Sequence, residues 1–236
     1  MIIINLNRNG DFRSIIAQAI KDAYTEDIRE LKYNYELKTF SSRHALAKDL
    51  LNTYVFKRLE KNRFIIEKFN RGAHEFISIY DKKEKSLYSL MKMKTFKGLE
   101  KSKKKKNVHY LESLGLLNNN IIPKESQIEF FEDEYRQSLM KELLVKIVSK
   151  EVVDEVEVHK LITFDIKNNE LTSISVFQLN SQLDIIDEES WNEYIGVDYD
   201  DIGTRESNMD TTKEDYALEE EIPLGIKGTD IQIKVK

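Results

Sequence analysis

The amino-acid sequence predicts an α+β fold, because its hydrophobic residues recur at helical spacing in some blocks and alternate as in strands in others. Strands and helices occupy separate blocks, which favours antiparallel pairing over a doubly wound parallel sheet. We therefore expect an antiparallel meander over about 63–94 and a second β-hairpin over about 156–179, packed with several helices.

Helical spacing is clearest before the meander and between the two β segments. Residues 11–36 are predicted to form two helices, or one helix that breaks near Thr25. Ser42 is expected to cap the helix that precedes the meander. Two more helices are expected over 107–118 and 132–150.

Turn lengths predict which residues of the meander face each other. The first turn is expected to consist of Arg71 and Gly72. This register places Glu75 between Lys68 and Lys92, in a row of charges at one end of the sheet.

One face of the meander is predicted to be apolar, whereas the other is mixed. The second turn is expected to be four residues long, which places Asp81 opposite Ser86 and extends the apolar face across three strands. The apolar face then carries Phe64, Ile66, Ile77, Ile79, Tyr88 and Leu90.

The second hairpin is predicted to turn at Asn168 and Asn169, because asparagine tolerates the left-handed backbone of a tight turn. A short element with the only tryptophan, Trp191, is expected to close a single α+β domain over 1–197. Residues 198–236 form an acidic and partly flexible C-terminal arm in this prediction, since ten acidic residues lie between Asp198 and Glu221.

Composition excludes several classes of protein. The absence of cysteine excludes disulfides, iron–sulfur clusters, zinc–thiolate sites and a cysteine nucleophile. No His, Asp or Glu residues follow a metal-ligand spacing, and phosphate-binding and dinucleotide-binding motifs are absent, so we expect no metal and no cofactor. No segment resembles a signal peptide or a membrane span, so a cytoplasmic location without membrane association is expected.

The charged end of the meander suggests a nuclease site in two forms. A metal-dependent nuclease needs a second acid two residues before a lysine on the next strand, and the third strand carries no carboxylate. A metal-free catalytic site stays open, with Glu75 or His109 as general base and Arg71 and Lys94 stabilising a phosphate. The structural alternative, which we favour, is that Glu75 forms cross-strand ion pairs with its neighbouring lysines.

A cluster of lysines after the meander is the candidate nucleic-acid binding site. Such a cluster neutralises phosphates and indicates salt-sensitive binding, although the alternative is an ordinary solvated loop. Opposite charge could also draw the acidic arm onto these lysines; the alternative is a solvated tail. The cluster consists of Lys97, Lys101, Lys103, Lys104, Lys105 and Lys106, and Glu100 is the only acid among them.

Four stretches carry a resemblance to a known family. They read "RGAHE", "YDKKEKSLYSLMKMKTF", "HYLESLGLLNNN" and "LTSISVFQLNSQLDIIDEESWNEYI". With these stretches the chain resembles, over about 42–195, an uncharacterised family of proteins from Gram-positive bacteria and their phages and mobile elements. One departure is His74, where the family pattern has a bulky aromatic residue. The resemblance implies a setting of accessory, defence or counter-defence proteins and no particular reaction.

The residues and the resemblance together predict an accessory binding or regulatory protein of a phage or mobile element. We expect it to act through a protein partner and, at the lysine cluster, through nucleic acid. The alternative is a metal-independent nuclease or toxin that acts on RNA or DNA at the metal-free site. The sequence predicts no oligomeric state.

Overall fold

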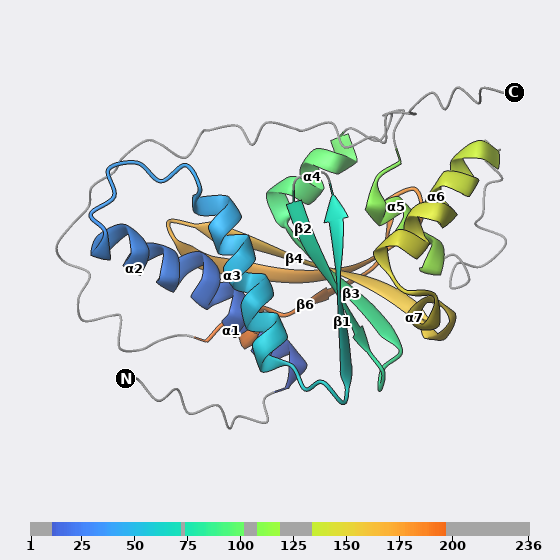
Figure 1. The fold of residues 1–236 in the computed structure, drawn as a ribbon, viewed down its shortest axis with the longest axis horizontal. Coiled ribbons are helices and arrows are strands. Elements are labelled where there is room, and N and C mark those ends of the chain that lie inside the picture. Colours follow the sequence, from blue (N-terminus) through green and yellow to red (C-terminus); the bar gives the residue numbers. More distant parts are fainter. Residues whose placement is uncertain (1–10, 72–73, 102–107, 119–133, 197–236) are drawn as a thin grey trace, which may run out of the picture.

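A mixed β-sheet lies at the centre of the molecule (Figure 1). The computed structural model describes residues 11–71, 74–101, 108–118 and 134–196, and within them the sheet has six strands in the order β1-β2-β3-β4-β5-β6. Neighbouring strands are antiparallel except β3 and β4, which are parallel. The predicted α+β class is confirmed. The strands are β1 (Phe64–Arg71), β2 (His74–Asp81), β3 (Ser86–Lys92), β4 (Val158–Lys167), β5 (Glu170–Leu179) and β6 (Ile185–Ser190).

The meander of β1, β2 and β3 has the predicted faces but not the predicted first turn. Asp81 faces Ser86, as expected. On the other side of β2, however, the pairing with β1 ends with Arg71 opposite His74. Glu75 therefore faces Asn70 rather than Lys68. The predicted pairing of β1 with β2 is therefore wrong by two residues. Because side chains alternate with a period of two, this shift leaves every residue on its predicted face.

One face of the sheet is covered by helices from the N-terminal part of the chain (Figure 1). The predicted break near Thr25 is a π-helix, where the Thr25 hydroxyl donates a hydrogen bond to the Lys21 carbonyl at 2.5 Å and competes with the regular helical bonds. Phe12 packs here against Trp191 and Tyr88. The elements are α1 (Phe12–Lys21), η1 (Asp22–Glu26), α2 (Asp27–Asn34) and α3 (Arg43–Arg58).

The opposite face, predicted to be mixed, is covered by a second layer of helices and forms a second core. These helices belong to the connection between β3 and β4, which must cross over because the two strands are parallel. The crossover helix α4 occupies the end of the predicted third strand and part of the lysine cluster, so the predicted strand is too long. Its elements are α4 (Met93–Lys101), α5 (Tyr110–Gly115), η2 (Leu116–Asn118), α6 (Glu134–Ile147) and α7 (Lys150–Glu155).

The second predicted hairpin, β4 with β5, is confirmed. Asn168 and Asn169 form its turn with φ angles of 52° and 60°, the left-handed region that a two-residue hairpin loop requires. The short element expected near Trp191 is a sixth strand, β6, followed by the 3₁₀ turn η4 (Asn192–Tyr194). The predicted acidic arm, 198–236, lies outside the described residues. Among the helices that the structure describes, none is long and apolar enough to span the hydrocarbon core of a bilayer.

A buried polar cluster ties the second helical layer to the sheet. The amide nitrogen of Asn118 donates to the carbonyls of His159 and Leu179 at 2.9 and 2.8 Å, while its oxygen accepts from the His159 backbone N–H at 2.7 Å. The His159 imidazole Nε2 shares a hydrogen bond of 2.9 Å with the Ser89 hydroxyl. Both side chains are buried, at 0% and 1% exposure, so this serine–histidine pair is structural rather than open to a substrate.

The buried imidazole makes the stability of the fold sensitive to acid. Burial lowers the pKa of His159 from 6.5 to about 3. The unfolded chain therefore binds a proton as the pH falls below about 6.5, whereas the folded chain does not until the pH approaches about 3. We expect the free energy of unfolding to fall by about 2 kcal/mol between pH 7.5 and pH 5 through this residue.

Urea unfolding at pH 7.5, 6 and 5 tests this expectation. His159→Gln keeps a hydrogen-bonding side chain but cannot titrate, so the variant should lose that part of the pH dependence. An identical pH dependence in the wild type and the variant would show that His159 does not carry the effect.

Candidate nucleic-acid interface

Helix α4 carries three lysines at the end of the sheet where β3 finishes. Lys94 and Lys97 are exposed, and within the described residues their ammonium groups form no ion pair. Lys101 closes the helix. The remaining lysines of the predicted cluster, Lys103, Lys104, Lys105 and Lys106, lie outside the described residues. The predicted lysine loop is therefore helical in its first part, which fixes the spacing of Lys94 and Lys97.

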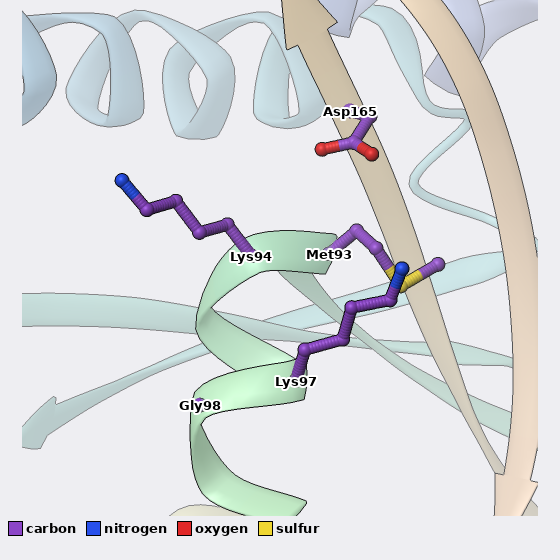
Figure 2. A pocket seen from close by; sticks show the side chains of 5 residues that line it. All are labelled: Met93, Lys94, Lys97, Gly98 and Asp165. Atoms are coloured by element: carbon purple, nitrogen blue, oxygen red, sulfur yellow. The ribbon is translucent and has the colours of Figure 1, made fainter. Parts of the chain in front are cut away.

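A shallow cavity lies between α4 and β4 (Figure 2). It is lined by Met93, Lys94, Lys97, Gly98 and Asp165. Figure 2 shows the Lys97 side chain running alongside Met93, while the Lys94 side chain extends away from the Asp165 carboxylate. The cavity thus offers two cations and one half-buried acid, an arrangement suited to an anion that approaches from the Lys94 side.

Helix α3 adds cations to the same end of the sheet. The Lys92 ammonium lies 3.0 Å from Nδ1 of His44 and 5.1 Å from the centre of the Tyr24 ring. One helical turn after His44, the Lys48 ammonium lies 3.6 Å from the centre of the Phe76 ring. The contacts of Lys92 with Tyr24 and of Lys48 with Phe76 are cation–π interactions, which hold a cation near the surface without neutralising its charge.

Aromatic side chains, most of them buried, lie beneath this surface and extend toward α5. Phe76 packs against Phe69 and Tyr110, with ring centres 5.6 and 5.9 Å apart. His109 caps α5 by accepting a hydrogen bond from the Leu111 N–H at 3.2 Å. The end of the sheet therefore combines cations with aromatic rings drawn from α3, β2, β3, α4 and α5. We call this surface the basic end, defined by His44, Lys48, Lys92, Lys94 and Lys97.

Sequence reasoning identified only part of the basic end. Lys97 stood out because it belongs to a lysine-rich run, and Lys94 because it ends the predicted third strand and belongs to the predicted metal-free site. His44 and Lys48 were missed, although their spacing of four residues places them on one side of a helix. Their relevance depends on where α3 packs, which composition does not indicate.

The four residues of the predicted metal-free catalytic site come from separate elements. Arg71 ends β1 and Lys94 is the second residue of α4, whereas Glu75 lies on β2 and His109 precedes α5. Glu75 is exposed, and strand alternation places it on the face opposite Phe76, the residue that contacts the neighbour of His109. The cavity at α4 is lined by Lys94 but by none of the other three.

The expected ion pairs of Glu75 are absent. In the part of the chain that the structure describes, Glu75 forms no ion pair with Lys68 or Lys92. Lys68 lies instead over the Phe56 ring of α3, at 5.5 Å, and Lys92 contacts His44. The two-residue shift in the register of β1 separates Glu75 from Lys68, and the pairing of β2 with β3 ends at Ser78 and Ser89, before it reaches Glu75 and Lys92. Among the described residues, no group of three or more His, Asp and Glu side chains is placed to hold a metal ion.

Comparison with known families covers nearly the whole chain. The profile of DUF5986, a family of unknown function, matches residues 5–232. The chain belongs to the DUF5986 family. The expected membership in an uncharacterised family is thereby confirmed, over a longer span than 42–195. No curated protein and no solved structure matches.

Membership in DUF5986 transfers no reaction and no residue roles, because the family has no assigned function. The candidate site of this DUF5986 protein therefore rests on its own geometry. That geometry consists of exposed lysines on α4 beside a shallow cavity, and of half-buried lysines on α3 and β3 that lie over aromatic rings.

Proposed function

We propose that this DUF5986 protein is a binding protein that contacts the phosphate backbone of a nucleic acid with its basic end. We further propose that it serves as an accessory or regulatory protein of a phage or mobile element and acts together with a protein partner, as the resemblance of its motifs implies. The observation that carries the proposal is the convergence of cations from three elements, α3, β3 and α4, on one surface.

The charge of the basic end supports an anionic ligand such as a phosphate backbone. Lys92 and Lys48 lie over the rings of Tyr24 and Phe76, which hold the two cations without neutralising their charge. Lys94 and Lys97 lie one turn apart on α4, and Figure 2 shows that Lys97 runs beside Met93 while Lys94 extends in the other direction, so the two ammonium groups present positive charge over a broad part of the surface. Lysine contacts to phosphates give affinity without base specificity.

Fluorescence anisotropy with labelled single-stranded and double-stranded oligonucleotides tests the proposal. The variant Lys94→Glu/Lys97→Glu should bind at least about 10-fold more weakly than the wild type at 50 mM salt. The slope of log K against log[salt] should also become shallower by about 1 to 2, because up to two phosphate contacts are lost.

The matched control is Lys141→Glu/Lys146→Glu, which reverses two exposed lysines on α6 and changes the net charge equally. This control should keep most of the affinity. Equal losses in both variants would mean that only net charge matters, and the basic end would then not be a binding site.

The same samples distinguish binding from cleavage. RNA and DNA should remain intact after incubation with the wild type, since Glu75 and His109 are not gathered around the cavity at α4. Cleavage by the wild type that disappears in Glu75→Ala and His109→Ala would contradict a purely binding role and establish the nuclease alternative.

A further inference from the structure

The outer edge of β6 is an interaction surface of the described sheet. β6 pairs with β5 on one side only, and in the described residues no strand pairs with its other side. Unpaired N–H and C=O groups along such an edge readily accept another strand. Ile185 and Ile186 are exposed by 44% and 37%, respectively, on this edge. An exposed edge with apolar residues favours a covering strand.

The acidic residues of β6 indicate which side chains a pairing strand should carry. Asp187 and Glu188 are exposed, and neither forms an ion pair within the described residues, whereas Glu189 is held by Arg13 at 2.9 Å. Like charges opposite each other destabilise a strand pair, so a second copy of β6 is a poor partner. Asp187 and Glu189 lie on one face of the sheet and Ile185 on the other, so a strand in which basic and apolar residues alternate is complementary to this edge.

One segment of the same chain has this chemistry. Residues 231–236 read "IQIKVK", in which Ile231, Ile233 and Val235 alternate with Gln232, Lys234 and Lys236. The segment lies outside the described residues. The described chain ends at Gly196, shortly after β6, and the intervening residues 197–230 are long enough to return to that edge, at about 3.3 Å per extended residue.

We propose that residues 231–236 add to the free edge of β6 as a further strand, with their lysines on the face of the sheet that carries Asp187. The apolar residues of the segment then lie on the opposite face, beside Ile185. This intramolecular contact protects the edge from aggregation and anchors the acidic segment 198–221 to the body of the protein at both of its ends.

Engineered disulfides test this contact, because the natural chain has no cysteine. Ile185→Cys, on the face that the apolar residues are expected to share, is combined in the full chain with a cysteine at position 231, 233 or 235, since the register is open. A disulfide requires Cα atoms within about 7 Å, so at least one pair should oxidise at least about 10-fold faster than a control pair. The control combines Ile233→Cys with Tyr33→Cys, an exposed position on α2.

Three outcomes of the disulfide experiment would overturn the proposal. Equal rates for all pairs would show that the segment does not contact β6. Faster oxidation of Ile185→Cys with Ile3→Cys would make the N-terminal apolar segment the occupant. Disulfide-linked dimers as the main product would mean that a second copy covers the edge.

Hydrogen exchange of the β6 amides gives a measurement without cysteines. In the full-length wild type, amides of residues 185–190 that do not bond to β5 should exchange at least about 10-fold more slowly than in Lys234→Glu/Lys236→Glu. The matched control, Lys213→Glu/Lys227→Glu, reverses two lysines outside the segment and should leave exchange unchanged. Rapid exchange of these amides in the wild type would contradict the proposal.

Discussion

Replacing Gly115 with alanine is expected to lower the free energy of unfolding by about 3 kcal/mol. Gly115 ends α5 where that helix meets the turn after β5. A Cβ atom at this position would lie 2.3 Å from the Asn180 carbonyl oxygen and 2.8 Å from the Ser181 nitrogen. These are backbone atoms, and the Asn180 side chain holds the turn by accepting bonds from the Gln182 and Asp184 N–H groups. The helix must therefore move away from the sheet.

Gly98→Ala is the matched control for this experiment. Gly98 lies within α4, and a Cβ atom there meets nothing within 4 Å. Alanine is a better helix former than glycine, so this variant should gain up to about 1 kcal/mol. Urea unfolding of both variants measures the difference. Similar stabilities for the two variants would mean that α5 does not pack as closely on the turn as described.

Replacing Arg63 with alanine is expected to cost about 3–5 kcal/mol, because it leaves a buried carboxylate without its cation. Asp81 is fully buried, and its carboxylate accepts bonds from the Arg63 Nε and Nη2 at 3.0 and 2.5 Å. It also accepts a bond from the Lys83 backbone N–H at 2.9 Å, which shapes the turn between β2 and β3. The substitution should therefore weaken the whole meander.

An exposed ion pair of similar length provides the comparison. The Lys85 ammonium lies 2.6 Å from the Glu157 carboxylate, but both side chains are more than half exposed. Lys85→Ala should cost at most about 1 kcal/mol. Thermal or urea unfolding of the two variants checks the contrast. If Arg63→Ala lowered the free energy of unfolding no more than Lys85→Ala does, burial of the Asp81 carboxylate would not be the reason for the predicted loss.

Local pattern predicted much of the sheet. Strand alternation predicted the apolar face that carries Ile77, Ile79 and Tyr88, and this face packs on α1 and α3. The Asn168–Asn169 turn was predicted for a physical reason, because few residues adopt positive φ without cost. The first turn was wrong because Arg71-Gly72 and Gly72-Ala73 are both compatible with the alternation. Periodicity alone therefore predicts which face of the sheet a residue lies on, but not which residue of the neighbouring strand it faces.

The parallel contact of β3 with β4 could not be predicted in the same way. Leu87 lies beside His159 in the register, although residues 93–157 separate the two strands. No local signal marks such a pair. The burial of the second face was not predicted for a related reason. This face carries polar residues such as Glu67 and Ser78, so its sequence does not indicate that helices cover it. Glu67 instead accepts a hydrogen bond from the Ser149 N–H at 2.9 Å, beneath the helices.

The candidate site shows the same limit. Composition identified Lys97, because six lysines in a short run are conspicuous in any sequence. The partners Lys48 and His44 belong to a distant helix, and only the packing of α3 brings them to the basic end. A surface assembled from several elements is therefore predicted only in part by reading along the chain.

The parallel contact between β3 and β4 also has a consequence for how the chain reaches its native state. Each half of the sheet, β1 to β3 and β4 to β6, is made of sequence neighbours and closes only short loops. Pairing β3 with β4 closes a loop that contains the whole crossover. The chain therefore loses the conformational entropy of this loop before the contacts between the two strands form. Joining the two halves is therefore the expected rate-limiting step of folding. Until it occurs, β3 and β4 each present an open edge to other chains, and rapid refolding at low protein concentration should give the highest yield.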